Sequence, residues 1–265
     1  MSWPKNGHDS RLSLGMARYF LELSYKGTAY SGFQVQANAG SIQEEVEKAF
    51  AVFFRKEVMM TGASRTDTGV HARQNYFHFD FADPIEEEMV YRLNAILPGD
   101  ICIRGIYRVP EGAHCRFDAE SREYRYYIYG QKDPFQADRA YFYPYPLNFE
   151  ELEKAAGSIK EFTDFTSFSK RNTQVRHFRC NIFESHWVHQ DGNSYYRIRA
   201  NRFLRGMVRG LTGTMLMVGR GHLTGEQFNE ILEGRSPSKV NFNVPAKGLF
   251  LDQIIYPEHY HLTQV

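Results

Sequence analysis

The sequence predicts an α+β fold, and two observations lead to this prediction. Aromatic residues make up 15% of the 265 residues, most of them Phe and Tyr, and these residue types are typical of strands. Up to residue 107, strand-like and helix-like patterns follow in the order strand, helix, strand, strand, helix, strand, which is the ferredoxin-like split arrangement. A chain of this length can form one large domain or two smaller ones with real cores.

The first half of the chain begins with a strand of aromatic and aliphatic residues at 18–25 and a glycine-bearing loop at 26–36. Ser41 followed by Glu44 predicts a helix start, because a hydroxyl and an acid at this spacing can form a capping box. Apolar residues from 42 to 53 recur at helical spacing and predict a buried stripe. The other predicted elements of this half are a strand at 76–81, a helix that opens at 86 and ends before 100, and a strand at 101–107.

The second half follows Pro110 and shows similar patterns. Alternating aromatic residues predict a strand, and two strand-like arms joined by Gln-Asp-Gly-Asn predict a hairpin. The predicted elements are strand 122–129, helix 148–159, hairpin arms 179–188 and 194–200, a helix that follows 203–209, helix 225–232 and strand 247–255.

The composition is ordinary for a soluble globular protein, with 42% hydrophobic and 24% charged residues. The net charge of +1 gives no sign of nucleic-acid binding, so such a sign must come from local clustering. No run of about eighteen apolar residues predicts a transmembrane helix, and the first fifteen residues lack an apolar signal core. We therefore expect a cytoplasmic location, no membrane partner, and a flexible N-terminal extension at 1–16.

Three cysteines, Cys102, Cys115 and Cys180, are odd in number and widely spaced. The chain has neither a Cys-x-x-Cys pair nor a His-Glu-x-x-His motif, so the sequence predicts no disulfide scaffold and no zinc site. His186 and His189 fall in a strand-like stretch without obvious co-ligands, and we interpret them as surface histidines.

The densest group of chemically active side chains lies at 62–73, where an acid, guanidinium groups, an imidazole and two glycines occur within one connection. Catalytic groups are commonly presented on connections between a helix and a strand. Arg65 beside Asp67 favours the charged carboxylate, and an ionised carboxylate suits a nucleophile or a general base. The glycines allow a ligand to approach the main chain closely.

Short parts of this run match other proteins. Asp-Thr-Gly at 67–69 is also the active-site triplet of aspartic proteases, and Asp-x-x-Gly occurs in GTPases. The chain has no Gly-x-x-x-x-Gly-Lys-Ser/Thr phosphate loop, which excludes the GTPase interpretation. It has no second Asp-Thr-Gly, so a protease would have to be a dimer.

The longer pattern Arg-Thr-Asp-x-Gly-Val-His-Ala at 65–72 resembles the catalytic motif of the TruA family of tRNA pseudouridine synthases. Motifs similar to that family follow in the same order from about residue 16 to residue 257, and this breadth weighs more than any single match. The loop at 26–36 resembles a family loop that approaches tRNA, although Lys26 and Phe33 stand where Asp and Trp are usual.

The resemblance implies roles for individual residues. Asp67 would act as nucleophile or base on an extruded uridine, and Arg209 would pair with it. Arg65 would fill the vacated place in the stack or guide base flipping. Tyr124 would stack on the uracil, because its ring offers a flat face and a polar tip.

Further residues would line or support the site. Gly248 and Leu249 resemble a family segment at the pocket wall. His71 belongs to the same motif as Asp67, and we expect it to stabilise the loop rather than to titrate in catalysis.

A basic cluster lies between 167 and 209, where nine Lys and Arg residues face two acids. A cluster of one sign beside aromatic residues is typical of phosphate-backbone binding, and arginine suits bidentate phosphate contacts. We expect Lys170, Arg171, Arg199 and Arg202 to contact the RNA.

As a whole, the resemblance implies two ferredoxin-like (RRM-like) halves that form one continuous antiparallel sheet, with helices on the outer faces and a central catalytic cleft. The expected organisation is an N-terminal half at 17–110 with the catalytic loop, a C-terminal half at 111–258 with the basic face, and a tail at 259–265. The implied activity is isomerisation of uridine to pseudouridine at positions 38, 39 and 40 of the tRNA anticodon stem-loop. The implied enzyme is a homodimer that needs no cofactor and no metal.

Two other classes remain open from the residues. The chain could be a catalytically idle RNA-binding module, because the ferredoxin-like plait is common among RNA binders. It could also be a dimeric aspartic protease built on Asp67, although the arginine before the acid argues against that class.

Overall fold

The computed structural model describes residues 15–37, 39–170, 175–190, 193–260 and 262–264. Most of the predicted N-terminal extension, residues 1–14, lies outside this part of the chain. The described residues form α-helices α1 Ile42–Phe54, α2 Glu87–Ile96, α3 Phe149–Ser158, α4 Met207–Gly219 and α5 Gly225–Glu233. The strands are β1 Ala17–Tyr25, β2 Thr61–Gly62, β3 His71–Phe81, β4 Ile101–Val109, β5 Ser121–Tyr129, β6 Tyr141–Phe142, β7 Ile182–Gln190, β8 Asn193–Ala200, β9 Leu249–Ile255 and β10 Thr263–Gln264.

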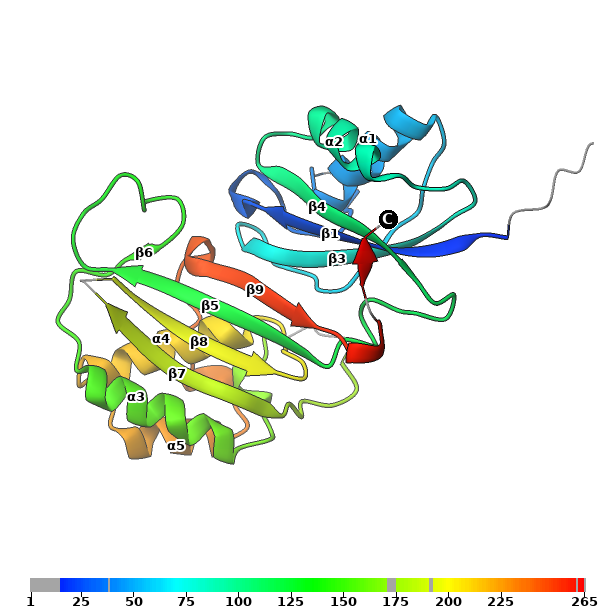
Figure 1. Cartoon of the computed structure of the whole chain (residues 1–265). Coiled ribbons are helices and arrows are strands. Elements are labelled where there is room, and N and C mark those ends of the chain that lie inside the picture. Colours follow the sequence, from blue (N-terminus) through cyan, green and yellow to red (C-terminus); the bar gives the residue numbers. More distant parts are fainter. Residues whose placement is uncertain (1–14, 38, 171–174, 191–192, 261, 265) are drawn as a thin grey trace, which may run out of the picture.

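All of these strands belong to one sheet, with the order β10-β4-β1-β3-β9-β5-β8-β7. Strand β2 adds to β3 and β6 adds to β5. Figure 1 shows this sheet passing from β1, β3 and β4 through β9 to β5, β8 and β7. The α+β fold class is confirmed.

The sheet is mixed, so the prediction of a continuous antiparallel sheet is wrong. Strand β6 pairs with β5 in parallel at one edge, and a second parallel pair lies at the centre. Strands β3 and β9 pair in parallel, through His71 with Phe250 and Ala72 with Leu251. The connections that lead into these strands lie against each other, since a Cβ on Gly69 would be 3.4 Å from the Cβ of Ala246. Strands β3 and β9 therefore begin next to each other and run in the same direction.

Two hydrophobic cores lie under the two ends of the sheet. One joins β1, β3, β4, α1 and α2, and it includes Leu251 and Ile254 of β9. The other joins β5, β7, β8, α3, α4 and α5, and it includes Val70 of the first half. Tyr124 packs against both cores. Because β9 pairs with β3 on one side and β5 on the other, it joins the two ends.

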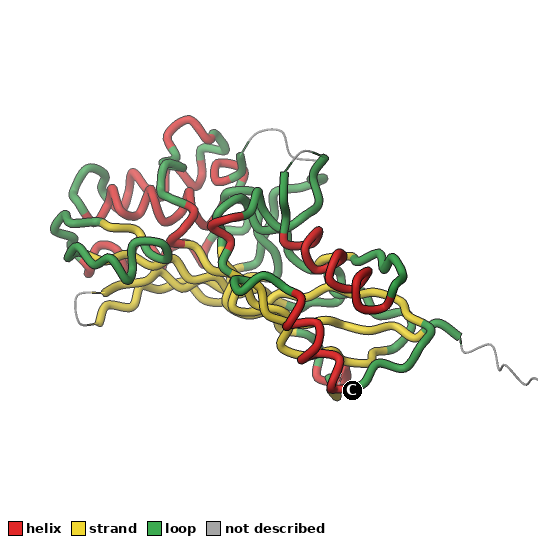
Figure 2. The backbone as a smooth tube through the Cα atoms, turned by 90° about the horizontal axis from the view of Figure 1, so that it is seen from above, coloured by secondary structure: helices red, strands yellow, loops and turns green. Residues whose placement is uncertain are grey.

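The helices cover the sheet in two groups. Figure 1 shows α1 and α2 against β1, β3 and β4, while α3, α4 and α5 lie against β5, β8 and β7. Figure 2 shows the strands as one layer along the length of the molecule. Helix α4 is buried along most of its length, and its Arg209 is one of two residues that remain half-buried.

The start of α1 is only partly as the sequence predicts. The Ser41 hydroxyl accepts a hydrogen bond from the Glu44 amide at 3.2 Å, as in a capping box. The Glu44 carboxylate pairs with Lys48 at 2.8 Å, one turn along the helix. A cation at this spacing competes with the cap for the carboxylate.

The end of the chain contributes to the sheet edge. Backbone atoms of Thr263 and Gln264 pair with Arg108 and Tyr107 of β4, so part of the predicted tail forms β10. Among the described residues, no helix combines the length and apolar character needed to cross a bilayer.

Candidate active site

A cavity of about 880 Å³ lies where the two cores meet. Its walls come from the Asp67 loop (residues 62–70), the connection from β4 into β5 and the connection from β8 into α4. The lining residues that the sequence predicts as functional are Arg65, Asp67, Tyr124, Arg202, Arg209 and Leu249. Residues distant in sequence thus share one cleft.

Asp67 is presented by a tight turn. The Val70 amide donates to the Asp67 carbonyl at 3.1 Å, and Gly69 has a φ of +76°, which a residue with a side chain rarely adopts. Asp67 is half-buried, and Arg65 is exposed. The turn therefore holds the carboxylate at the cavity wall with one side open.

A buried polar network holds the Asp67 loop from behind. The hydroxyls of Tyr25 and Thr66 are 2.8 Å apart. The Asn75 amide donates to the Ser64 carbonyl at 2.9 Å and to the Tyr25 hydroxyl at 3.2 Å. Burial raises the pKa of Tyr25, so its hydroxyl remains neutral and able to hold this network. Satisfied buried networks of this kind fix a loop in one arrangement.

The loop at 26–36 packs beside the Asp67 loop. The Phe33 amide donates to the Thr66 carbonyl at 3.1 Å, and the Phe33 ring, 1% exposed, stacks on Phe77 at 4.6 Å between centroids. Lys26 pairs with Asp138 at 2.5 Å. The unusual Phe33 therefore fills the first core, and the unusual Lys26 makes an ion pair with the second half.

Tyr124 stands half-buried in the cleft, with its ring at 5.0 Å from Phe203 in an edge-to-face arrangement. Burial raises the pKa of Tyr124 to about 12, with an opposing effect of Arg122 and a smaller contribution from the Asp67 charge. The hydroxyl is therefore neutral at physiological pH. Asp67 and Tyr124 line the same cavity.

Arg209 lies on the cleft wall without an ion pair to Asp67. Its Nε and Nη2 atoms donate to the Val244 carbonyl at 2.9 Å and 2.6 Å. Among the described residues, no Asp67 oxygen lies within 4.0 Å of the Arg209 nitrogens. The structure brings the two side chains to one cavity, and their direct pairing stays a prediction.

Six arginines line the cavity: Arg65, Arg116, Arg122, Arg202, Arg205 and Arg209. In the described part of the chain, none of them has a carboxylate within ion-pair distance. Burial lowers the pKa of Arg116, and the positive charges of Arg65 and Arg202 lower it further. Like charges that crowd a concave surface create a positive potential that favours a polyanion.

Some of these groups were not predicted from the sequence as site residues. Arg116 and Phe117 lie in the connection before β5, and Phe117 is 73% exposed at the cavity. The signal was a basic residue beside an aromatic one, immediately before a strand that carries Tyr124. Arg122 has a different role, because it donates to the carbonyls of Ala119 and Asn201 and fixes the wall itself.

Other predicted residues do not line the cavity. His71 is fully buried, its Nδ1 accepts from the Gly27 amide at 3.1 Å, and its ring stacks on Phe250 at 4.6 Å. Burial lowers the pKa of His71. These contacts favour the structural role that we expected. Gly248 is buried against the Tyr126 ring, where a Cβ would lie 2.7 Å from a ring carbon.

The remaining basic residues predicted to bind RNA fall into three cases. Arg199 pairs with Glu184 on the sheet. Lys170 packs its side chain over Gly206 at the start of α4 and lies 5.9 Å from the centre of the Phe242 ring. Arg171 lies outside the described residues.

Outside the cavity, His78, His114 and Cys115 gather into a group that could hold a metal ion. The sequence predicts no zinc site, because it has neither a Cys-x-x-Cys pair nor a His-Glu-x-x-His motif. The three cysteines themselves are free thiols.

Comparison with known proteins shows which family the chain resembles. Residues 162–257 match a family model described as tRNA pseudouridine synthase. A protein of Parabacteroides distasonis named tRNA pseudouridine synthase A is 42% identical to this chain, over 92% of the chain and 97% of that protein. Proteins with the same name from Bacteroides fragilis and Staphylococcus aureus are 42% and 34% identical, over 92% and 91% of this chain and 98% and 93% of their own lengths.

The chain belongs to the tRNA pseudouridine synthase A family. Membership over nearly the whole chain confirms the resemblance inferred from the motif at 65–72. None of these comparisons supports the alternative that the chain is an aspartic protease.

Proposed function

We propose that this protein is a tRNA pseudouridine synthase that isomerises uridine at positions 38, 39 and 40 of the anticodon stem-loop. One observation carries the proposal: Asp67 lines a cavity together with the ring of Tyr124 and with arginines that pair with no carboxylate among the described residues. A cleft of this charge suits an RNA backbone, and a single carboxylate beside an aromatic ring suits an extruded base. The names of the relatives support the same substrate and reaction.

RNA would enter by its phosphates. The exposed Arg65, together with Arg116 and Arg202, would neutralise phosphates around the target nucleotide, because guanidinium groups bind phosphate oxygens in bidentate fashion. The target uridine would leave the stack at a cost of a few kcal/mol. Arg65 would occupy the vacated position or guide the flip.

The isomerisation conserves all atoms of the nucleoside except for an exchange of one proton. The bond between ribose C1′ and base N1 breaks, the uracil turns, and a bond between C1′ and C5 forms. The hydrogen on C5 then leaves as a proton, and N1 gains one. Asp67 would act on the base or on the ribose, Tyr124 would stack on the uracil, and Arg209 would position the Asp67 carboxylate.

The wider organisation is part of the proposal. The halves at 17–110 and 111–258 would each be ferredoxin-like, which the two separate cores support. The protein would act as a homodimer in the cytoplasm, with one tRNA across both subunits. Neither a cofactor nor a metal takes part in the isomerisation itself.

The proposal is tested with unmodified tRNA transcripts incubated with the wild-type protein and with Asp67→Asn. Pseudouridine is mapped by carbodiimide adducts and primer extension. We expect new stops in the anticodon arm for the wild type alone, while Asp67→Asn still binds tRNA. Binding without stops for the wild type would identify an idle RNA-binding module, and stops elsewhere in the tRNA would refute the assigned positions.

A further inference from the structure

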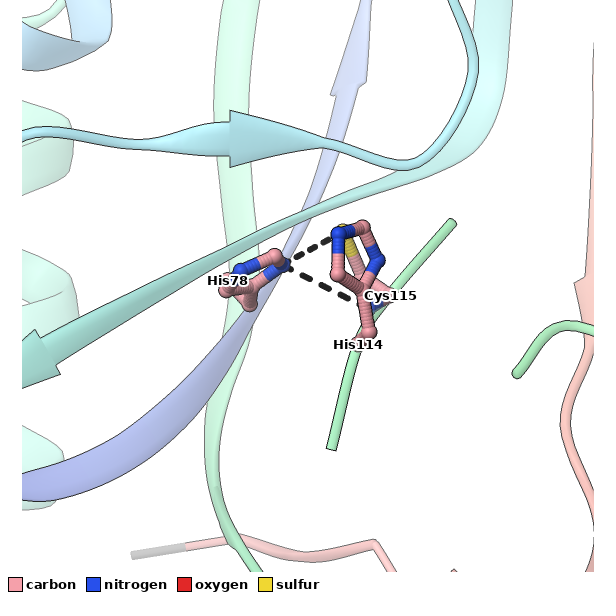
Figure 3. A group of neighbouring side chains, drawn as sticks. All are labelled: His78, His114 and Cys115. Carbon is pink, nitrogen blue, oxygen red and sulfur yellow. Dashed lines mark hydrogen bonds between the residues drawn. The ribbon is translucent and has the colours of Figure 1, made fainter. Parts of the chain in front are cut away.

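Three side chains with metal-binding atoms meet behind the cleft wall, on the side of the first core. His78 lies on β3, and His114 and Cys115 lie in the connection from β4 into β5. Figure 3 shows the two imidazoles and the thiol turned toward one another. One ligand atom from each residue lies within 4.8 Å of the others.

The distances between these groups are short. The Nδ1 atom of His78 is 3.2 Å from the Cys115 sulfur, and it accepts a hydrogen bond from the Cys115 amide at 3.4 Å. The ring of His114 lies 4.5 Å from the His78 ring, measured between centroids. Cys115 is fully buried and His78 is 8% exposed, whereas His114 is half-buried and offers solvent access.

We propose that His78, His114 and Cys115 bind one Zn²⁺ ion, with water as the fourth ligand. A tetrahedral zinc ion takes nitrogen at about 2.0–2.1 Å and sulfur at about 2.3 Å, so a bound nitrogen and sulfur stand about 3.6 Å apart. The separation of 3.2 Å between His78 and Cys115 needs an adjustment of only a few tenths of an ångström. Two imidazoles and one thiolate form a donor set that zinc prefers.

The surroundings prepare two of the ligands. The hydrogen bond from the Cys115 amide to Nδ1 holds the His78 ring beside the thiol, and zinc would take the place of the amide hydrogen on the Nδ1 lone pair. The Cys115 thiol donates to the Thr61 carbonyl at 3.1 Å, which fixes the side chain. The Asp118 carboxylate accepts from the His114 amide at 2.6 Å and orients the segment that carries both ligands.

Binding is a proton exchange. The Cys115 thiol donates its hydrogen to the Thr61 carbonyl, so the sulfur carries a proton without metal. Zinc replaces this proton, the sulfur–metal bond forms, and one proton passes to solvent. Affinity therefore increases with pH, as is general for thiolate sites.

The ion would connect the first core to the wall of the cleft. The Phe117 ring packs against His114 in a tilted arrangement with 4.2 Å between ring centroids, and its neighbour Arg116 also lines the cavity. Zinc would thus hold the segment 114–117 against β3 and keep this wall in place. The role is structural, and it does not depend on the reaction that the cleft performs.

The test uses purified full-length protein stripped with a chelator and titrated with Co²⁺, which replaces Zn²⁺ and has a visible spectrum. We expect one equivalent to produce a thiolate-to-cobalt charge-transfer band that Zn²⁺ abolishes. The band should disappear in Cys115→Ser and in His78→Gln. It should persist in the control Cys180→Ser, which removes another buried thiol.

Two further measurements on the wild type test zinc binding even if a variant fails to fold. Zinc should release one proton per ion into a weakly buffered indicator solution, and it should raise the unfolding midpoint of the stripped protein. No charge-transfer band in the wild type, or a band that survives in a folded Cys115→Ser, would overturn the proposal. Because none of these readouts involves tRNA, their failure is separate from a failure of the proposed function.

Discussion

The Tyr25 hydroxyl offers a sharp test of how the Asp67 loop is held. Tyr25→Phe keeps the ring in the first core and removes only the oxygen that contacts the Thr66 hydroxyl and the Asn75 amide. Thr66 is adjacent to Asp67, so losing the contact at Thr66 should loosen the position of the Asp67 carboxylate. We expect a loss of stability together with a loss of turnover.

The magnitude follows from the two hydrogen bonds. Each buried hydrogen bond contributes about 0.5–1.5 kcal/mol net, so removing both costs about 2 kcal/mol. At about 2–4 °C per kcal/mol for a chain of this size, the unfolding midpoint should fall by about 6 °C. The rate of the chemical step should fall while tRNA affinity remains close to wild type, because the arginines of the cleft are unchanged.

The matched control is Tyr19→Phe, on the same strand. Tyr19 is 4% exposed and stacks on Phe79 at 5.6 Å, and its hydroxyl makes no hydrogen bond among the described residues. Differential scanning calorimetry and single-turnover kinetics would be run on both variants. Equal midpoints and equal rates for the two would refute the assigned role of the network.

Three other predictions concern the loop, the charged sheet face and the cleft. Gly32→Ala should lower the free energy of unfolding by more than about 1 kcal/mol. Gly32 has a φ of +109°, and a Cβ there would lie 3.0 Å from a carbonyl oxygen of the Asp67 loop. A urea midpoint equal to that of the wild type would contradict this prediction. Burial raises the pKa of Glu123, but hydrogen bonds from Arg197 and Arg125 lower it more, so its pKa lies below the usual value. This carboxylate therefore stabilises the protein fully above about pH 4.3, and the stabilisation is lost as pH falls through the folded-state pKa. Glu123→Gln should have a lower free energy of unfolding than the wild type at pH 7 and should lose less of it between pH 7 and pH 3. An equal loss for the two proteins, measured by urea unfolding at both pH values, would argue against this role. Arg116→Ala should weaken tRNA binding and reduce the slope of log K against log salt by about one unit, and an unchanged slope in filter-binding assays would show that this arginine contacts no phosphate.

The sequence predicted the local elements well because each one is specified by its own residues. The apolar stripe of α1 and the alternation along β5 need no distant partner to be recognised. The parallel pairing of β3 with β9 could not be predicted in this way. It depends on Gly69 and Ala246 meeting across the junction of the two halves, which no local pattern records.

The site shows the same division. Asp67 and Arg65 stand in one motif and could be found from it. Arg116 stands beside Phe117 just before β5, but this short signal does not show that the connection reaches the cavity of the Asp67 loop, which depends on the fold. The cluster of His78 with Cys115 likewise depends on that fold.

The central claim is that the Asp67 carboxylate drives the isomerisation. It is tested most directly by single-turnover release of tritium from C5 of the uridines in labelled tRNA, with enzyme in excess, for the wild type and Asp67→Asn. Because the C5 hydrogen must leave for the new bond to persist, release reports the chemical step. We predict that Asp67→Asn binds tRNA as the wild type does and releases tritium about 10³-fold more slowly, whereas release at a rate close to wild type would contradict the claim.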